Sequence, residues 1–320
     1  MVLEEHPDFL DTNPDEVEGE RLFEGDILLT PTQRRSLNER KGIAHPYYRW
    51  RDGSDGLPLV PYTFGDRSVD RVAVWEGLEH WMEHTCITFQ RATTTRTPHL
   101  RFIKGGGCYS YVGRMGQWRG QPVSIGTNCN VLGIVVHEVG HAIGFVHEQS
   151  RPDRDGYIKI INSNVIPNRR SNFNKYSNAV INNMDVPYDY SSVMHYGPKG
   201  FTVNGKTTIS THNPLAQGMI GRRVRNLPGL SHRDKLLANR MYNCIDKWLK
   251  QCNMITDPCQ NDGYLGKDCN CVCPPGTTGT NCEDVTGGYY DDFLDSYTEK
   301  ITMTGTITSP NHPNKYPAGM

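Results

Sequence analysis

The sequence contains no uninterrupted apolar run of about 18 residues or more, which is the usual signal of a transmembrane helix. It also lacks an excess of either charge, because 34 Lys and Arg side chains are balanced by 35 Asp and Glu side chains. This balance argues against a nucleic-acid partner, which would favour a strongly basic surface. The first ten residues carry acids where a secretory signal would have a basic start and an apolar core. We therefore expect that the natural N-terminus precedes Met1 and that the chain is incomplete.

The ten cysteines are an even number, and six of them fall between Cys252 and Cys282. None of them has the Cys-x-x-Cys spacing that a structural zinc cluster would favour. A dense, even set is instead typical of a disulfide-stapled module made in an oxidising compartment. The sequence thus predicts a secreted, extracellular protein, with a zinc cluster as the minor alternative.

A chain of 320 residues is long enough for one sizeable core and one or two small modules. Its first 26 residues hold ten acids and a single arginine, so we expect this stretch to bury little. The basic pairs Arg34-Arg35 and Arg40-Lys41 are typical protease targets. We predict four parts: a prosegment remnant at 1–40, a large α+β domain at 41–246, a cysteine-dense module at 248–283, and a linker with a truncated strand-like start at 284–320.

Hydrophobic periodicity predicts the main elements of the large domain. The segment 69–86 has helical spacing, with one apolar side formed by Val72, Val74, Trp75, Leu78 and Trp81. ITFQRA (87–92) and HLRFIK (99–104) alternate like strands. VLGIVVHEVGHAIGF (131–145) predicts a long buried helix, and 230–244 predicts a helix with Ser231 as its N-cap.

The strongest local signal is the string HEVGHAIGFVH at 137–147. On a helix His137 and His141 share one face, and Glu138 is rotated away from direct ligation but can reach a water on the metal. Gly144 can adopt a positive φ and end the helix, so that His147 returns as a third ligand. Three neutral imidazoles leave one position open, as in a catalytic zinc site, and Glu138 would serve as general base.

The alternative for such a string is a buried helix whose histidines are satisfied by packing. His80 and His84 share the four-residue spacing but lack the Gly-x-x-His continuation. We interpret that pair as histidines on the face of a helix and not as ligands.

HEVGHAIGFVHEQSRPDRD (137–155) resembles the signature of the astacin family of metzincin zinc peptidases. SVMHY (192–196) resembles the Met-turn of that family, GCYSYVGRMG (107–116) its cleft-lining strand, and LSHRDKLLANRMYNC (230–244) its closing helix. The resemblance covers about 40–245. It implies a metzincin-type fold with two lobes around a cleft, one Zn²⁺ per subunit, and endopeptidase activity on proteins or peptides.

The resemblance also implies roles for individual residues. Met194 would be an apolar floor under the zinc, and Tyr196 would ligate zinc at rest and then bind the oxyanion of the transition state. Tyr109, Ser110 and Tyr111 would pair with an extended substrate. Arg223 is the expected source of a preference for an acidic residue after the cut bond.

Phe23-Glu24-Gly25-Asp26 resembles the prosegment motif of the family, which implies that Asp26 ligates zinc in a latent zymogen. Cleavage after Arg40 would create an N-terminus that folds inward to Glu148, although Arg34-Arg35 offers another cleavage site.

The cysteine-dense module resembles an EGF-like domain, and GTITSPNHPNKYP (305–317) resembles the start of a CUB domain that we expect to be poorly ordered alone. Both modules would contact extracellular partners. The resemblance implies the disulfides Cys86–Cys244, Cys108–Cys129, Cys252–Cys269, Cys259–Cys271 and Cys273–Cys282. Two rival functions remain open: an inactive family member that acts as a binding protein, and a zinc hydrolase of non-peptide amides.

Overall fold

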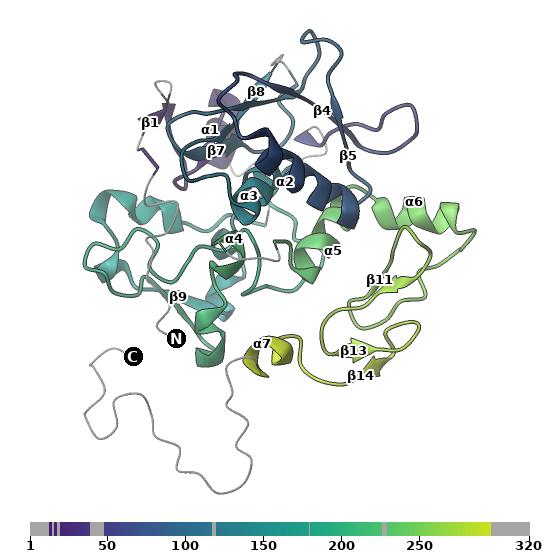
Figure 1. Ribbon diagram of the computed structural model, residues 1–320. Coiled ribbons are helices and arrows are strands. Elements are labelled where there is room, and N and C mark those ends of the chain that lie inside the picture. Colours follow the sequence, from purple (N-terminus) through teal and green to yellow (C-terminus); the bar gives the residue numbers. More distant parts are fainter. Residues whose placement is uncertain are drawn as a thin grey trace, which may run out of the picture.

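The computed structural model describes residues 13–14, 16–17, 20–38, 48–116, 120–178, 180–225 and 229–295. Figure 1 shows a sheet with helices α2 and α3 in the upper part of the molecule and a largely irregular region with β9 and α4 below it. The C-terminal strands β11, β13 and β14 lie to one side. The residues expected to form the CUB-like start after 295, and the bond between Arg40 and Lys41, lie outside the described residues.

The central sheet has six strands in the order β3-β7-β8-β6-β4-β5. These are Ile27–Leu28, Cys108–Tyr111, Gln121–Ile125, Leu100–Ile103, Leu59–Phe64 and Thr88–Arg91. Every neighbouring pair is parallel except β7 and β8, which are antiparallel. The mixed sheet and the helices beside it confirm the predicted α+β class.

The first of these strands, β3, directly follows residues 1–26, the acidic stretch that we expected to bury little. That expectation is wrong for residues 22–26, four of which are buried. β3 pairs with β7, and Ile27 and Leu29 pack against Val112. Composition failed here because the acidic residues Glu24 and Asp26 are buried next to this strand, where they contact the histidines of the metal cluster.

Helix α2, Arg71–His84, begins at the N-cap Asp70, whose carboxylate accepts from the amides of Val72 and Ala73. The prediction of its apolar side is partly wrong, because Val72 is 67% exposed and Trp75 is 45% exposed. The buried face is instead built on Val74, Leu78 and Trp81. Residues at these spacings stack along one side of a helix, whereas positions 72 and 75 are rotated away from it.

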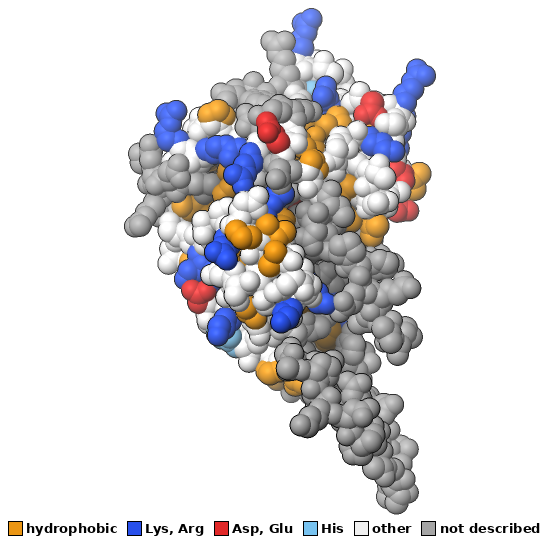
Figure 2. All heavy atoms as spheres, turned by 90° about the vertical axis from the view of Figure 1, so that its left-hand side faces the viewer, with side chains coloured by type: hydrophobic (Ala, Val, Ile, Leu, Met, Phe, Trp, Pro, Cys, Tyr) orange, Lys and Arg blue, Asp and Glu red, His pale blue; other side chains and the backbone are white. Residues whose placement is uncertain are grey.

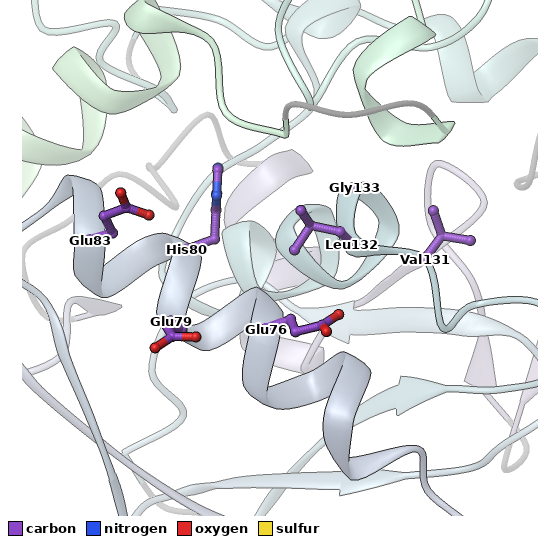
Figure 3. A pocket seen from close by; sticks show the side chains of 7 residues that line it. All are labelled: Glu76, Glu79, His80, Glu83, Val131, Leu132 and Gly133. Carbon is purple, nitrogen blue, oxygen red and sulfur yellow. The ribbon is translucent and has the colours of Figure 1, made fainter.

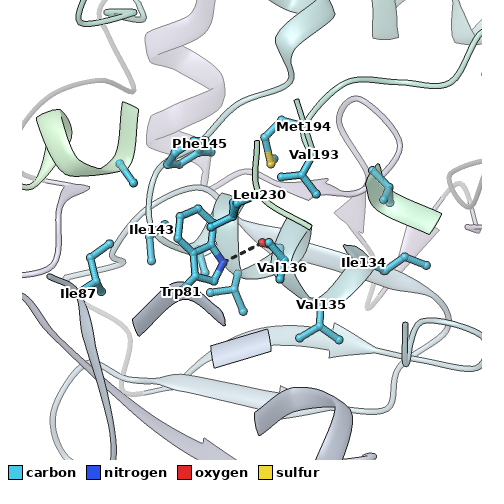
Figure 4. Close-up of a cluster of buried hydrophobic side chains, with 14 of the residues drawn as sticks. Trp81, Ile87, Ile134, Val135, Val136, Ile143, Phe145, Val193, Met194 and Leu230 are labelled. Carbon is cyan, nitrogen blue, oxygen red and sulfur yellow. Dashed lines mark hydrogen bonds between the residues drawn. The ribbon is translucent and has the colours of Figure 1, made fainter. Parts of the chain in front are cut away.

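Helix α3, Leu132–Ala142, is buried over almost its full length and lies between α2 and the sheet strands β7 and β8. The indole N–H of Trp81 donates to the carbonyl of Val136 at 3.1 Å (Figure 4). Gly77 allows the two helices to approach closely, since a Cβ there would lie 2.4 Å from Cγ1 of Val135. The helix therefore sits in the centre of the core, as its apolar sequence predicted.

The remaining elements of the N-terminal and lower regions are short. β1 (Glu16–Val17) pairs with β2 (Glu20–Arg21), α1 spans Pro31–Asn38, β9 (Ile158–Ile160) pairs with β10 (Ile209–Thr211), and α4 spans Arg222–Arg225. The 3₁₀ helices are Glu148–Ser150, Arg154–Gly156, Asn162–Asn164, Pro167–Phe173 and Pro214–Gly218. Between them the chain is held by turns and by side-chain hydrogen bonds.

The predicted helix at 230–244 is α5, His232–Met241, and Ser231 is its N-cap in a capping box with Asp234. The helix ends earlier than predicted because Asn243 adopts a left-handed φ of 54°. A new helix, α6 (Cys244–Gln251), begins directly after it.

The five disulfides join the pairs that the resemblance implied: Cys86–Cys244, Cys108–Cys129, Cys252–Cys269, Cys259–Cys271 and Cys273–Cys282. The last three staple a small unit with four two-residue strands: Tyr264–Leu265, Cys271–Val272, Thr277–Thr278 and Asp284–Val285. In the order of the chain these strands are β11, β12, β13 and β14, and α7 (Asp291–Asp295) follows them.

Two tyrosines after the disulfide unit return to the large domain. The hydroxyl of Tyr290 lies 3.1 Å from Oδ1 of Asp189 and accepts from the amide of Tyr190. The guanidinium of Arg233 lies 4.0 Å from the centre of the Tyr289 ring. His232, next to Arg233, hydrogen-bonds to the carbonyl of Asp262 at 2.7 Å, and its ring lies 6.5 Å from that of Tyr289. The start of α5 thus contacts both the disulfide unit and the tyrosines that follow it.

None of the helices in the described ranges combines the length and apolar character needed to span a bilayer. On the face shown in Figure 2, Lys and Arg side chains are dispersed among uncharged and apolar surface.

Candidate metal centre

Helix α3 places His137 and His141 one turn apart, and the chain then reverses at Gly144, whose φ is +112°. The amide of Gly144 donates to the carbonyl of His141, and the amide of Phe145 donates to the carbonyl of Gly140. This reversal lets His147 return to the first two histidines, as the sequence predicted. The three imidazoles and the carboxylate of Asp26 form one buried cluster of potential metal ligands.

The hydrogen bonds of the outer ring nitrogens show which nitrogens face inward without a proton. Nδ1 of His137 donates to the carbonyl of Val193 at 2.8 Å, and Nδ1 of His141 donates to the carbonyl of Phe145 at 2.9 Å. Nδ1 of His147 donates to Oε2 of Glu24 at 2.7 Å. In neutral rings the Nε2 atoms are therefore lone-pair acceptors.

These lone pairs point at one another. Nε2 of His137 lies 3.1 Å from Nε2 of His141 and 3.0 Å from Oδ2 of Asp26, which also lies 3.1 Å from Nε2 of His147. Acceptors at this separation in a dry site repel one another unless a cation lies between them. Three imidazole nitrogens and one carboxylate are a preferred zinc donor set. The residues present therefore fit a zinc ion.

Glu138 is fully buried beside this cluster, and neither of its carboxylate oxygens has a hydrogen-bond partner among the described residues. Burial, with the neighbouring charge of Asp26, raises the pKa of Glu138 well above its ordinary value. A buried carboxyl with unpartnered oxygens is costly unless a further molecule binds to it. The arrangement suits a group that exchanges a proton with a reactant.

Met194 packs against α3, where its Sδ atom would be 3.0 Å from a Cβ on Gly140 (Figure 4). Asp234 fixes this turn in place, which the sequence did not reveal. Its carboxylate accepts from the hydroxyl of Ser192 at 2.6 Å and from the amide of Val193 at 2.9 Å. The spacing of Ser231 and Asp234 predicts a capping box, but not the second pair of bonds.

Tyr196 follows the turn, and its ring lies 4.6 Å from that of His147, measured between centroids. Its hydroxyl donates to the main-chain carbonyl of Glu24, and its amide donates to the side chain of Gln149 at 3.0 Å. In this form of the chain the phenol is therefore bound to the N-terminal segment. The roles expected for Tyr196 as ligand and as oxyanion donor stay predictions.

The strand predicted to pair with substrate is β7, and its residues Tyr109, Ser110 and Tyr111 are buried under the N-terminal segment. Its partner is β3, which runs parallel to it, and the amide of Ser110 donates to the carbonyl of Asp26 at 2.9 Å. The N-terminal segment thus lies along this strand and delivers Asp26 to the histidines in the same stretch.

Arg223 is engaged elsewhere. Its guanidinium donates to the carbonyls of Gly229 and Leu230, both at 3.3 Å, and its own carbonyl packs against Gly133 in the first turn of α3. Its expected contact with an acidic substrate residue stays a prediction.

The histidine pair on α2 differs from the metal pair in its partners. The rings of His80 and His84 are 4.7 Å apart, as are those of His137 and His141. Nε2 of His80, however, accepts the amide of Leu230 at 3.2 Å, which is a structural hydrogen bond. His80 lines a surface pocket of about 520 Å³ between α2 and the start of α3 (Figure 3), and none of the three metal histidines is among its lining residues.

A mixed sheet, a buried helix carrying two ligands and a carboxylate, and a third ligand after a glycine reversal together define a zinc metallopeptidase. Comparison with known proteins gives the family. Residues 43–243 match the family model described as Astacin, a family of peptidases. The chain belongs to this family, and zinc is its cofactor.

Several relatives have similar sequences. Blastula protease 10 of Paracentrotus lividus is 38% identical over 315 residues, a match that covers 93% of this chain and 50% of that protein. Zinc metalloproteinase nas-34 of Caenorhabditis elegans is 36% identical over 347 residues, covering 98% of this chain and 54% of that protein. The chain thus spans about half the length of these curated relatives.

Among solved structures, the hatching enzyme zinc-protease high choriolytic enzyme 1 of Oryzias latipes matches with a TM-score of 0.56 and 36% identity. The match covers 62% of this chain and 96% of that chain.

Proposed function

We propose that this chain is the latent form of a secreted zinc endopeptidase, which hydrolyses peptide bonds of extracellular proteins once its N-terminal segment is removed. The observation that carries the proposal is the meeting of three imidazoles with Asp26 beside the unpartnered carboxyl of Glu138. Relatives named as zinc metalloproteinases support the reaction class. The five disulfides support an extracellular location.

Zinc, when bound, polarises the scissile carbonyl and lowers the pKa of a water molecule to about 7. Glu138 would accept a proton from the attacking water and pass it to the leaving amine. The hydroxyl of Tyr196, once released from Glu24, would donate a hydrogen bond to the oxyanion that forms on the carbonyl. Strand β7 offers its main-chain groups to an extended substrate after β3 has left.

Latency in this proposal rests on Asp26, which takes the position of the reacting water. The segment that carries it is held by several bonds to the large domain. The side chain of Asn13 donates to the carbonyls of Gly25 and Cys108, at 2.9 and 2.7 Å, and Gln33 donates to the carbonyl of Val112 at 2.9 Å. The segment therefore blocks the metal, Tyr196 and β7 at once.

Activation would create a new N-terminus, which we assign to Glu148. This carboxylate is buried, accepts from Nη1 of Arg151 at 3.0 Å and from the amide of Asp189 at 2.7 Å, and lines a cavity of about 50 Å³. Burial raises the pKa of Glu148 to about 8. An ammonium group entering the cavity would keep the carboxylate ionised. Cleavage after Arg40 supplies such a group, with Arg34-Arg35 as the alternative.

The C-terminal parts would extend recognition. We propose that residues 248–283 form an EGF-like module and that residues 284–320 lead into a CUB-like module, both of which contact extracellular proteins. The three disulfides of the small unit are compatible with the first assignment.

The test compares the intact chain with the chain after limited proteolysis by trypsin, using a casein substrate and a fluorogenic peptide. Activity should emerge on proteolysis and disappear with a zinc chelator. Asp26→Asn in the uncut chain should raise activity about tenfold or more, because a charged ligand is replaced by a neutral one. An activated chain that binds zinc and cuts neither substrate would contradict the proposal and favour a binding protein.

A further inference from the structure

The three metal histidines differ in what holds their outer nitrogen. His137 and His141 donate to carbonyls of the peptidase domain itself, those of Val193 and Phe145. His147 donates instead to the carboxylate of Glu24, which belongs to the N-terminal segment. When that segment leaves, the peptidase domain keeps the first two bonds and loses the third. A metal-bound imidazole normally retains a partner on its outer nitrogen.

The pocket that holds the Glu24 carboxyl contains two further hydroxyl groups. Both hydroxyls lie within hydrogen-bonding reach of the Glu24 carboxyl. Oε1 of Glu24, Oγ of Ser150 and Oη of Tyr176 are buried, and none of them has a regular hydrogen bond among the described residues. The carboxyl of Glu24 is therefore surrounded by three potential donors, Nδ1 of His147 and these two hydroxyls.

The walls around these polar groups are apolar and belong mostly to the peptidase domain. Tyr176 packs in a cluster with Val112, Val180 and Ile181, and Val146 packs against the same cluster. The amide of Tyr176 donates to the carbonyl of Ser150 at 2.8 Å, which holds the two hydroxyl-bearing residues together. The shape suits a side chain with an apolar stem and a carboxylate tip.

We propose that Nδ1 of His147, Oγ of Ser150 and Oη of Tyr176 form a carboxylate-binding subsite of the active enzyme, which takes an acidic side chain of a bound protein substrate and which Glu24 fills in the latent form. The inference rests on the proposed function, because it requires that the segment leaves and that a peptide replaces it. All three groups can donate, and the ring of His147 gains positive character from its metal, so an ionised carboxylate is preferred over an amide.

The first experiment measures binding without turnover. A peptide with the sequence of residues 20–30, and its Glu24→Gln and Glu24→Ala forms, are titrated calorimetrically into activated enzyme that carries Glu138→Gln. We expect the glutamine and alanine peptides to bind about tenfold or more weakly than the native peptide. Tyr176→Phe and Ser150→Ala in the enzyme should each reduce that difference. Equal affinity of the three peptides would overturn the proposal.

The second experiment measures selectivity. Activated wild-type and Tyr176→Phe enzymes are compared on peptide substrates that differ only by Glu or Gln at each position around the cut bond. At one position the Glu-to-Gln ratio of kcat/KM should fall several-fold in the variant. Tyr264→Phe, the same deletion in the disulfide unit, should leave the ratio intact.

The two hypotheses fail in different ways. If activated wild-type enzyme cuts no substrate, the proposed function fails, whatever the peptides do. If it cuts but the ratio is equal in wild type and Tyr176→Phe, the subsite fails alone. Should Tyr176→Phe not fold, Ser150→Ala gives the same comparison, and an unchanged ratio there has the same meaning.

Discussion

At the scale of single residues, the metal cluster depends on more residues than its three histidines. It needs a reversal at Gly144, the absence of a side chain at Gly140, and a carboxyl at Glu138 that nothing else engages among the described residues. Each is a local condition that one substitution can remove. Substitutions at single residues can therefore change catalysis without unfolding the chain.

Glu138→Gln should keep zinc but lower kcat by about 10²–10⁴-fold, because an amide cannot accept the proton of the attacking water. Zinc content by atomic absorption and turnover on a fluorogenic peptide measure the two properties. Glu79→Gln, an exposed position on α2, serves as the control and should be silent. Substantial turnover in Glu138→Gln would mean that another group is the base.

Gly25→Ala should weaken latency. Gly25 has a φ of +88°, and a Cβ there would lie 2.6 Å from Cζ of Phe201, so the segment that carries Asp26 must shift. We expect the uncut variant to show measurable peptidase activity that the uncut wild type lacks.

Gly56→Ala is the matched control for that prediction. Gly56 has a similar φ of +75° but has no atom within 4 Å of the added Cβ. An uncut Gly56→Ala chain should stay as inactive as the wild type. Equal activity of the two uncut variants would contradict the prediction, because Gly56 lies outside the segment that carries Asp26.

The sequence could predict residues whose role is set by neighbours along the chain. His137, His141 and Gly144 belong to this class, because helical geometry fixes their relation. Glu24 does not, since its contact with His147 joins positions 123 residues apart. Periodicity and motif spacing carry no signal for such a bond.

At the scale of elements, the sequence predicts where helices start better than it predicts which face of a helix is buried. Asp70 and Ser231 mark helix starts that caps predict. Val72 and Trp75 were placed on the wrong face of α2, because apolar residues outside the core are common and a short helix offers two plausible stripes. The end of α5 also escaped prediction, since it depends on the left-handed turn at Asn243.

Asp234→Ala should destabilise the folded chain by about 2–4 kcal/mol, because one buried carboxylate both closes the capping box of α5 and holds Ser192 and Val193. Urea unfolding followed by tryptophan fluorescence measures the loss. Asp246→Ala, an exposed acid in the first turn of α6, should cost far less. Similar costs for both would show that the bonds to the turn before Met194 contribute nothing.

At the scale of the whole molecule, the Cys86–Cys244 bridge joins α2 to the last part of the large domain across 158 residues. Replacing both cysteines with alanine should lower the free energy of unfolding by about 4–5 kcal/mol, because the unfolded chain gains the freedom of a long loop. The same replacement at Cys273–Cys282, which are 9 residues apart, should cost about 3 kcal/mol. Equilibrium unfolding in urea compares them, and a larger loss from the short loop would contradict the entropic argument.

The pairing of distant strands was the feature of the fold that the sequence predicted least well. The class of fold followed from motifs and from alternating strands and helices. The parallel pairing of β3 with β7, however, adds the end of an acidic stretch with few apolar residues to one edge of the central sheet. Such pairing depends on one short run of apolar residues meeting a strand about 80 positions later, which no window of sequence contains.

The tyrosine contacts at the end of the disulfide unit constrain its motion. A module attached only by a linker would adopt many orientations. This unit is also held by the hydrogen bonds of Tyr290 with Asp189 and of His232 with Asp262. One of its side chains, Ile255, is 97% exposed. The contacts of the unit with Asp189 and His232 therefore hold this exposed side chain at one position relative to the metal cluster.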